Sequence, residues 1–487
     1  MLFNSIHFVF FFLIVTPLYF LLPQKYRCFL LLAASCYFYM AFIPIYILIL
    51  GFTIVVDYFA GIWLEKTKGK NKKWFLIASL IANIGVLAVF KYYDFLNENL
   101  SALLNTFGYH NHIPNLGLIL PIGLSFHTFQ AISYTVEVYR GRQKAERHFG
   151  IYALYVMYYP QLVAGPIERP QNLIHQLYTK YEFDYYRISE GLRLMLWGLV
   201  KKMVIADRLG IFVNEVYNNP ASYQGFPLIW ATYFFAIQIY CDFSGYSDIA
   251  IGASRIMGIN LMQNFRTPYF SKNIQEFWSR WHISLSTWFR DYVFLPFAYS
   301  TSRKMPKEKY FGIRADILIY LAATVVTFFL CGLWHGANWT YVLWGLLHGF
   351  YIICGIIIAR FIKQFGSNAL KSGKNRIFNI LSIFITFHIV LLAWVFFRAN
   401  NVHDAFYILK NMMAVSTTSI IGVPTISSKF FMISLVLILL LFVSDYYKIF
   451  TKINSVRYIN YVKVLFLITL IYLFGIFEVQ QFIYFQF

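Results

Sequence analysis

The sequence has little charge for its length. Of its 487 residues, 13% are Asp, Glu, Lys or Arg and 59% are hydrophobic. A soluble domain would carry roughly twice that share of charged residues. A water-soluble globular protein is therefore excluded, and we expect lipid to be the main solvent of this chain.

Paired cysteines and metal-ligand motifs are missing as well. The five cysteines lie in or beside apolar segments and show neither C-x-x-C pairing nor the spacing of a disulfide framework. The sequence also has no H-E-x-x-H motif, Walker A loop or G-x-S-x-G elbow. These absences argue against a metal or nucleotide hydrolase, and we expect no metal and no tightly bound cofactor.

The charge that is present is mostly basic. The formal net charge is +20, but the Lys and Arg residues stand in short clusters between long apolar runs. This distribution is typical of cytoplasmic loops that contact anionic lipid heads, so we expect membrane lipid and not nucleic acid as the partner. The clusters that we place on the cytoplasmic side are residues 66–73, 140–147, 303–314, 360–376 and 448–463.

Long apolar runs predict membrane-crossing helices, each of roughly 20 residues. The run 28–64 is too long for one crossing and contains Pro44, so two helices fit it better. The other runs are 6–22, 74–90, 116–135, 151–164, 192–213, 226–240, 317–334, 339–358, 377–397, 430–443 and 464–477. The sequence thus predicts an all-α polytopic integral membrane protein with about 11–13 membrane helices.

Residues 275–296 do not have the pattern of a membrane span. Large apolar residues such as Phe277, Trp281 and Trp288 recur on one face at helical spacing, and polar residues including His282 and Arg290 form a stripe on another. We expect one amphipathic helix on the membrane surface or lining a cavity. On periodicity alone, a histidine at the lipid interface is somewhat favoured for His282 over a polar group that approaches His335.

His335 is the leading candidate for chemistry, because an ionisable side chain inside hydrocarbon usually faces a cavity or a partner. The flanking Gly332 and Gly336 leave room for a ligand or another backbone. A neutral imidazole could take a proton from a hydroxyl acceptor, with Asn338 and Tyr341 orienting it or stabilising an oxyanion. The alternative is a histidine that ties two helices together, and position alone leaves the two interpretations about even.

Other polar residues in apolar surroundings are interpreted as structural. His348 follows His335 by thirteen residues, so on one continuous helix the two would lie roughly 20 Å apart and could not act on one atom. Asp242 and Asp248 interrupt an apolar region, and we expect them to pair with arginines of residues 275–296 as part of the scaffold.

Several segments taken together form a recognisable set. They are residues 120–126 with 139–141, 163–167, 242–252, 277–286, 332–339 and 394–399. With this set, which extends over nearly the whole chain, the sequence resembles the membrane-bound O-acyltransferase (MBOAT) family, and within it the bacterial branch of alginate O-acetyltransferase-like proteins. The two histidine-containing segments, 277–286 and 332–339, are the specific ones.

The resemblance implies a single transmembrane domain over residues 1–487, with amphipathic and re-entrant helices around a central tunnel. It implies that His335 is essential for acyl transfer and that His282 is a second catalytic residue. The substrate contacts expected on this basis are Asn338, Tyr341, Trp334 and Arg280.

The resemblance also implies a substrate pair and a partner. Acetyl-CoA is the expected donor, and the acceptor is an extracytoplasmic polysaccharide, either an alginate-like exopolysaccharide or a cell-wall glycan. A separate extracytoplasmic SGNH-type acetyltransferase is the expected partner, and the bacterial cytoplasmic (inner) membrane is the expected location.

Two alternatives remain open from the sequence. The first is a D-alanyl or peptidoglycan acyl-transfer relative of the same family. The second is a non-enzymatic transporter of lipid-linked glycans, which would also need many spans and intramembrane polar residues. Transporters often consist of paired halves with broken helices at matching positions, and no such repeat is visible, so this interpretation ranks second.

Overall fold

The computed structural model describes residues 1–365, 376–414, 423, 426–451, 457–478 and 482–483. This part of the chain is almost entirely helical, and its only strands are the two-residue β1 (Lys309–Tyr310) and β2 (Ile313–Arg314), which pair as a hairpin. Seven of its helical stretches are long and apolar enough to cross a membrane, and two shorter apolar helices accompany them. The predicted class, an all-α polytopic membrane protein, is confirmed.

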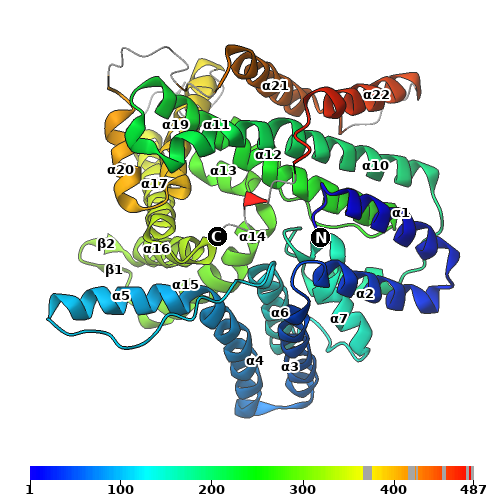
Figure 1. Cartoon of the computed structure of the whole chain (residues 1–487). Helices are drawn as coiled ribbons and strands as arrows, with labels where there is room; N and C mark the ends of the chain where they lie inside the picture. Colours follow the sequence, from blue (N-terminus) through cyan, green and yellow to red (C-terminus); the bar gives the residue numbers. More distant parts are fainter. Residues whose placement is uncertain (366–375, 415–422, 424–425, 452–456, 479–481, 484–487) are drawn as a thin grey trace.

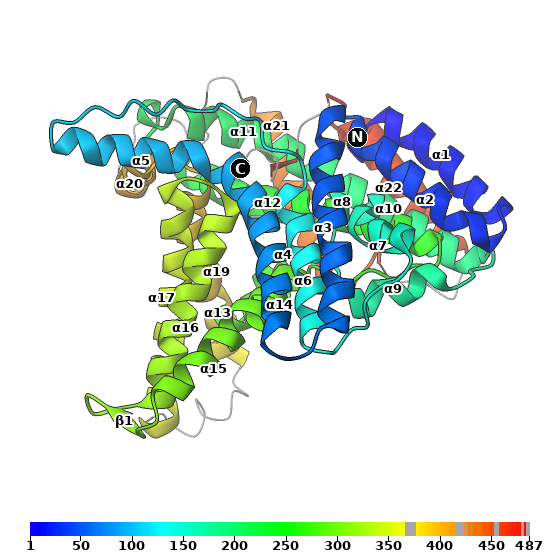
Figure 2. The same ribbon diagram turned by 90° about the horizontal axis from the view of Figure 1, so that it is seen from below.

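The first apolar runs form a group of helices on one side of the molecule (Figures 1 and 2). They are α1 (Ile6–Leu21), α2 (Gln24–Met40), α3 (Ile47–Lys66), α4 (Lys72–Leu87) and α6 (Leu124–Tyr139). Pro44 begins a 3-10 turn, η1 (Pro44–Tyr46), between α2 and α3, so the predicted division of residues 28–64 into two helices is confirmed. The run 116–135 is helical only from Leu124.

The helix that contains α4 does not stop at the end of its apolar run. A π-helical segment, η3 (Ala88–Tyr92), joins it to α5 (Tyr93–Thr106), which lies across the upper edge of the molecule in Figure 2. π-Helical segments are rare and are frequently found at functional sites. This one brings Lys91 and Tyr92 to the end of α16 (Ala315–His335).

The core of the molecule is α12 (Phe226–Ile256), a 31-residue helix whose side chains are mostly buried. At 1.5 Å per residue it is roughly 46 Å long, which is enough to cross a bilayer at a tilt. It lies beside a second continuous helical rod (Figure 1). That rod consists of α10 (Tyr185–Leu199), the π-helix η4 (Val200–Ala206) and α11 (Asp207–Asn218).

Two pairs of glycines set the distance between α10 and α12. A Cβ atom on Gly198 would lie 2.6 Å from the carbonyl oxygen of Gly245, and one on Gly191 would lie 2.7 Å from that of Gly252. The pairs are seven residues apart on each helix and match in opposite order, so the two antiparallel backbones touch every second turn. A larger side chain at these positions would push the helices apart.

Residues 275–296 depart from the predicted single amphipathic helix. The chain forms α13 (Ile274–Arg280), α14 (Ile283–Phe289), the π-helix η7 (Arg290–Phe294) and then α15 (Leu295–Lys304). The break falls at His282, whose φ of 42° lies in the left-handed region. Backbone contacts with residues 264 and 266 hold this kink, and periodicity cannot detect such contacts. The prediction of one continuous helix is therefore wrong.

The remaining helices complete the bundle. Short helices α7 (Phe149–Met157), α8 (Tyr159–Leu162) and α9 (Pro170–Tyr178) divide the run 151–164 and the segment after it. The 3-10 turns are η2 (Gly69–Asn71), η5 (Pro220–Ser222) and η6 (Pro268–Phe270). The later helices are α17 (Trp339–Phe365), α19 (Arg376–Arg398), α20 (Val402–Asn411), α21 (Ser428–Tyr447) and α22 (Arg457–Phe474).

Three of the basic clusters lie at one end of the helices. The ammonium of Lys72 donates to the carbonyl oxygen of Tyr139 at 2.7 Å, which joins the α3–α4 turn to the end of α6. The β1–β2 hairpin, which follows α15, lies at the same lower end in Figure 2. By the positive-inside rule we expect this end to face the cytoplasm. Residues 366–375 of cluster 360–376 lie outside the described residues.

Candidate active site

The α16–α17 hairpin carries His335 at its turn, and glycines allow the two helices to touch there. A Cβ atom on Gly332 would lie 2.4 Å from the carbonyl oxygen of Tyr341, and one on Gly336 would lie 2.2 Å from the Tyr341 ring. The prediction that these glycines leave room for another backbone is therefore confirmed at Gly332, whereas Gly336 makes room for the Tyr341 ring. The close approach packs Tyr341 against the residues that flank His335.

His335 is the last residue of α16 and is buried among aromatic rings. The ring centroids of Trp334 and Trp344 both lie 4.8 Å from its own, and that of Phe397 lies 5.1 Å away. These rings come from α16, α17 and α19, so three helices together define the position of the imidazole. An apolar surrounding of this kind favours a neutral imidazole, the form that a general base requires.

Lys91 and Tyr92 hold the end of α16 from outside the hairpin. The Lys91 ammonium donates to the carbonyl oxygens of Trp334 at 2.6 Å and His335 at 3.0 Å, and the Tyr92 hydroxyl donates to that of Leu333 at 2.7 Å. The last carbonyls of an α-helix lack partners within the helix. Three consecutive ones are satisfied here by two neighbouring residues of the π-helix η3.

A cavity of about 660 Å³ opens beyond the α16–α17 turn, and its wall includes Gly336 and Asn338. It is rich in amide and charged side chains. These are Asn214, Asn218, Gln238, Asn338, Asn400, Lys91, Lys202, Arg398, Asp207 and Asp242. We call it the outer cavity, since it lies beyond the end of α16 that is away from the basic hairpin. Its polar wall suits a hydroxylated ligand.

A second cavity, the inner groove, follows α16 on the other side of His335. It has a volume of about 340 Å³, and the residues that it touches on α16 include Tyr320, Thr324, Thr327 and Cys331. Cys331 lies one helical turn before His335. A small cavity of about 40 Å³ touches His335, Trp334 and Lys91 directly. Along α16 and its turn, His335 therefore lies between the inner groove and the outer cavity, and it lines the small cavity directly.

His282 lies close to this centre and not at a lipid interface. It is fully buried, and its ring centroid lies 6.2 Å from that of Trp334, whose ring also contacts His335. Phe243 packs edge-on against His282 with centroids 4.4 Å apart. The interfacial interpretation favoured by periodicity is wrong, because the kink at His282 turns the side chain into the protein.

His348 lies closer to His335 than a continuous helix would allow. The chain turns between the two residues, and both imidazoles pack against Trp344, with centroids 4.8 and 5.0 Å away. The predicted separation was therefore wrong, because it assumed one helix. The Trp278 indole donates to Nδ1 of His348 at 3.3 Å.

Of the four residues expected to contact substrate, three line a cavity near His335 and Arg280 does not. Asn338 and Tyr341 line the outer cavity, and Trp334 lines the small one. The Asn338 side chain also caps α17, because its oxygen accepts from the backbone N–H of Thr340 at 2.9 Å. Arg280 pairs with Glu276 within α13 and lines neither these cavities nor the inner groove.

The acids of α12 pair with lysines and not with the predicted arginines. Lys202 Nζ lies 2.7 Å from carboxylate oxygens of both Asp207 and Asp242, and Lys201 Nζ lies 2.6 Å from Asp248. Both lysines come from the π-helix η4. The sequence separates Lys202 from Asp242 by 40 residues, so no local pattern could identify the pairing.

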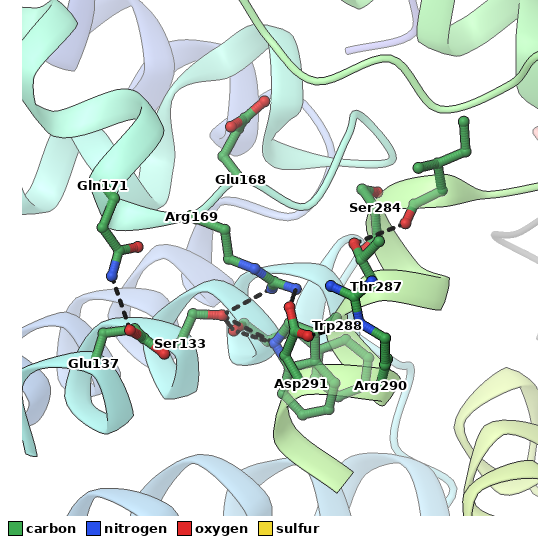
Figure 3. A network of polar contacts seen from close by, with 12 residues as sticks. Ser133, Glu137, Glu168, Arg169, Gln171, Ser284, Thr287, Trp288, Arg290 and Asp291 are labelled. Carbon is green, nitrogen blue, oxygen red and sulfur yellow. Dashed lines mark hydrogen bonds and ion pairs between the residues drawn. The ribbon is translucent and has the colours of Figure 1, made fainter. Parts of the chain in front are cut away.

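A second polar network joins α6, the α8–α9 loop with the start of α9, and the segment formed by α14 and η7 (Figure 3). The Trp288 indole donates to Ser133 Oγ at 2.9 Å, Arg169 lies 3.7 Å from Asp291, and Gln171 donates to Glu137 at 2.9 Å. The Trp288 ring stacks on Phe129 with centroids 3.8 Å apart, and Phe129 in turn stacks on Trp334. The network thus contacts Trp334, beside His335, through the stacked rings of Trp288 and Phe129.

The loop 165–169, which connects α8 and α9, contains a buried acid. Glu168 is fully buried and accepts a hydrogen bond from Asn172 at 2.6 Å. Burial raises the pKa of Glu168 to about 7. The backbone N–H of Ile167 donates to Ser284 Oγ at 3.0 Å, which ties this loop to the residues after His282.

Sequence reasoning missed three residues of the site region: Lys91, Arg398 and Asn264. Lys91 directly follows the apolar run 74–90. A single cation at the end of a predicted span could have marked it as a candidate functional residue. Arg398 belongs to segment 394–399 and lines the outer cavity, where its guanidinium donates to the side-chain oxygens of Asn214 and Asn218. For Asn264 the sequence offers no signal.

Comparison with known proteins assigns the chain to a class of enzyme. The sequence model of the MBOAT, membrane-bound O-acyltransferase family, matches residues 146–397, which is more than half of the chain. The chain therefore belongs to this family and is a multi-pass membrane O-acyltransferase. The transporter alternative is not supported.

Three individual relatives show which members of the family this chain is similar to. The probable alginate O-acetylase AlgI of Pseudomonas aeruginosa is 35% identical over 424 residues, covering 86% of this chain and 76% of the relative. The peptidoglycan O-acetyltransferase of Helicobacter pylori is 34% identical over 465 residues, covering 88% and 83%. The teichoic acid D-alanyltransferase of Bacillus subtilis is 29% identical over 338 residues, covering 68% and 80%. The resemblance to the alginate O-acetylase branch is confirmed.

Proposed function

We propose that this protein transfers an acetyl group, or another short acyl group, from a cytoplasmic thioester donor toward hydroxyls of an extracytoplasmic polysaccharide. The observation that carries the proposal is the position of His335 between the inner groove and the outer cavity. Two relatives named for O-acetyl transfer are 34% and 35% identical, against 29% for the D-alanyltransferase, which favours an acetyl group. The polymer is an alginate-like exopolysaccharide or a cell-wall glycan.

His335 serves as the general base in this proposal. Its imidazole takes the proton of the acceptor hydroxyl while the hydroxyl oxygen attacks the carbonyl carbon of the thioester. The C–S bond then breaks, and the proton passes to the thiolate, so the products are an ester and a free thiol. The rings of Trp334, Trp344 and Phe397 exclude water that would otherwise hydrolyse the donor.

The two spaces separate donor from acceptor. The inner groove begins near the basic end of α16, which supports acetyl-CoA as the donor and the bacterial cytoplasmic membrane as the location. Outside its membrane helices the described part of the chain consists of short helices, turns and loops. A separate extracytoplasmic SGNH-type acetyltransferase therefore receives the acyl group and completes its transfer to the polymer.

The test is acyl transfer by protein in proteoliposomes, with labelled acetyl-CoA as donor and an oligosaccharide acceptor, with and without the extracytoplasmic partner. His335→Ala and His335→Gln should each lose roughly 100-fold or more in rate, because glutamine keeps hydrogen bonding but cannot take the proton. His388→Gln is the matched control, since His388 also lies in a membrane helix, where it bonds the Tyr233 hydroxyl. Near-normal transfer by His335→Gln would exclude base catalysis there.

A further inference from the structure

Asn264 holds the kink that places His282. It is buried in the segment between α12 and α13, and its carbonyl oxygen accepts from the backbone N–H of Ile283 at 2.8 Å. Its side-chain Oδ1 is approached by three groups: Ser284 N at 3.2 Å, Ser284 Oγ at 2.9 Å and His282 Nδ1 at 3.1 Å. Its Nδ2 donates to Ser247 Oγ of α12 at 3.2 Å.

These contacts define which end of the Asn264 amide is the oxygen. A backbone N–H can only donate, so the atom that meets Ser284 N must be an acceptor. Reversing the amide would place an NH₂ group against that N–H. Ser284 Oγ already accepts from the backbone N–H of Ile167, so its own hydrogen is available for Oδ1. The orientation of Asn264 therefore follows from its surroundings.

The orientation of the amide decides the tautomer of His282. Because Oδ1 has no hydrogen to give, the imidazole nitrogen that contacts it must carry one. A neutral imidazole has a single N–H, so Nδ1 carries the hydrogen and Nε2 carries the lone pair. The aromatic rings of Phe126, Phe243 and Trp334 position the imidazole plane, but they cannot select a tautomer.

We propose that Asn264 is the positioning residue that selects the Nδ1–H tautomer of His282, so that Nε2 is the nitrogen able to accept a hydrogen bond or a proton during acyl transfer. This inference rests on the proposed function for the role of His282, but not for the tautomer itself. In the wrong tautomer His282 would present an N–H at Nε2, which cannot accept.

The first test reads the tautomer without any activity. In full-length protein labelled with ¹⁵N-histidine and held in lipid nanodiscs, the His282 signals are identified by subtracting the spectrum of His282→Gln. The wild type should show a protonated Nδ1 and an unprotonated Nε2. Asn264→Asp, whose carboxylate only accepts, should show the same pattern, and Asn264→Leu should lose it. A protonated Nε2 in the neutral wild-type ring would overturn the proposal, whether or not the Leu variant folds.

The second test measures acyl transfer at saturating donor. Asn264→Leu should lower kcat roughly tenfold or more with KM for the donor nearly unchanged, and Asn264→Asp should restore most of the rate. Gln176→Leu is the matched control, because Gln176 is a buried amide that bonds the backbone of Asn260 in the same segment. Equal losses in the Leu and Asp variants, or in the control, would overturn the positioning role. A wild type with the expected tautomer but no transfer activity would refute the proposed function and leave the tautomer assignment standing.

Discussion

Two groups of ionisable residues lie deep in the helix bundle, and they are built in opposite ways. Around η4 each lysine meets a carboxylate: Lys202 contacts Asp207 and Asp242, and Lys201 contacts Asp248. His282 and His335 instead lie among aromatic rings, and the small cavity touches His335. An ionisable residue inside a membrane protein usually has a specific role. A residue that is paired with an opposite charge stabilises the fold, whereas a histidine among uncharged rings remains available for chemistry.

The two groups differ in what a substitution would leave behind in the protein interior. A buried ion pair recovers through its partner much of the free energy that dehydration costs, so removing one member leaves an uncompensated charge. A neutral imidazole among aromatic rings leaves no such charge when it is replaced. Substitutions in the first group should therefore lower stability, even though Lys202, Asp207 and Asp242 also line the outer cavity, and substitutions in the second should affect the reaction with little loss of stability.

The largest effect on stability is expected for Lys202→Met. Two carboxylates would lose their shared ammonium, which should cost about 3–5 kcal/mol of unfolding free energy. Thermal unfolding in detergent and the yield of monodisperse protein measure the loss. His335→Ala is the comparison variant and should unfold at nearly the wild-type temperature while losing acyl transfer. If Lys202→Met were as stable as the wild type, the distinction between the two groups would be wrong.

A smaller loss of stability is expected when the contact between α10 and α12 is enlarged. Gly245→Leu would place a side chain where a Cβ alone would lie 2.7 Å from the carbonyl oxygen of Gly198. Overpacking of this kind should cost about 1–3 kcal/mol, and more if the backbones cannot separate. The control is Gly85→Leu in α4, where a Cβ has no neighbour within 4 Å. Equal melting temperatures for the two variants would refute the close-contact account.

A moderate effect on rate is expected at Lys91. Lys91→Met removes two charge-assisted hydrogen bonds from the carbonyl oxygens of Trp334 and His335, bonds of a kind worth roughly 1.5–3 kcal/mol each. Since only part of this loss should reach the transition state, we expect roughly a tenfold lower kcat with folding retained. Tyr92→Phe, which removes one neutral bond, should show a smaller effect. Lys70→Met, in an exposed loop, controls for the lost charge; an equal effect there would contradict the role of Lys91.

The smallest perturbation, a single exposed cysteine, tests which end of the helix bundle faces the cytoplasm. The names inner groove and outer cavity depend on that orientation. Single cysteines at Lys70 and Lys307 should react with an impermeant maleimide only from the cytoplasmic side, and one at Asn105 of α5 only from outside. All three positions are exposed, and wild-type protein with its five native cysteines serves as the background. Labelling of the Lys307 variant in intact cells would reverse the assignment of donor and acceptor sides.

Predictions from the sequence succeeded where the governing physics is local. Long apolar runs predicted helices, Pro44 predicted a break between α2 and α3, and Gly332 predicted a close backbone approach. The prediction failed at His282, where periodicity suggested a continuous surface helix. The left-handed kink there depends on hydrogen bonds to Asn264, which precedes His282 by 18 residues in the chain and lies outside the amphipathic stretch 275–296.

The pairing between helices could not be predicted from the sequence either, because it also joins residues that are far apart in the chain. The acids Asp242 and Asp248 do form ion pairs, but with lysines of η4 and not with the predicted arginines of residues 275–296. Lys201 and Lys202 reach them because η4 packs beside α12, and α10, which continues into η4, is held there by the glycine pairs. Helix neighbours are determined by packing over the whole bundle, and one sequence contains no direct record of them.

The sequence by itself determined that this protein lies in a membrane, which class of protein it is, and that His335 is the leading candidate for its chemistry. Low charge and long apolar runs require a membrane, and the segments around His282 and His335 identify an acyltransferase family. Only the tertiary structure decided that these two histidines contact one tryptophan, that His335 lies between two cavities, and that Lys91 and Asn264 support the centre. The physical reason is that hydropathy acts on each residue where it stands, whereas a reaction centre requires side chains from separate helices to meet within a few ångströms.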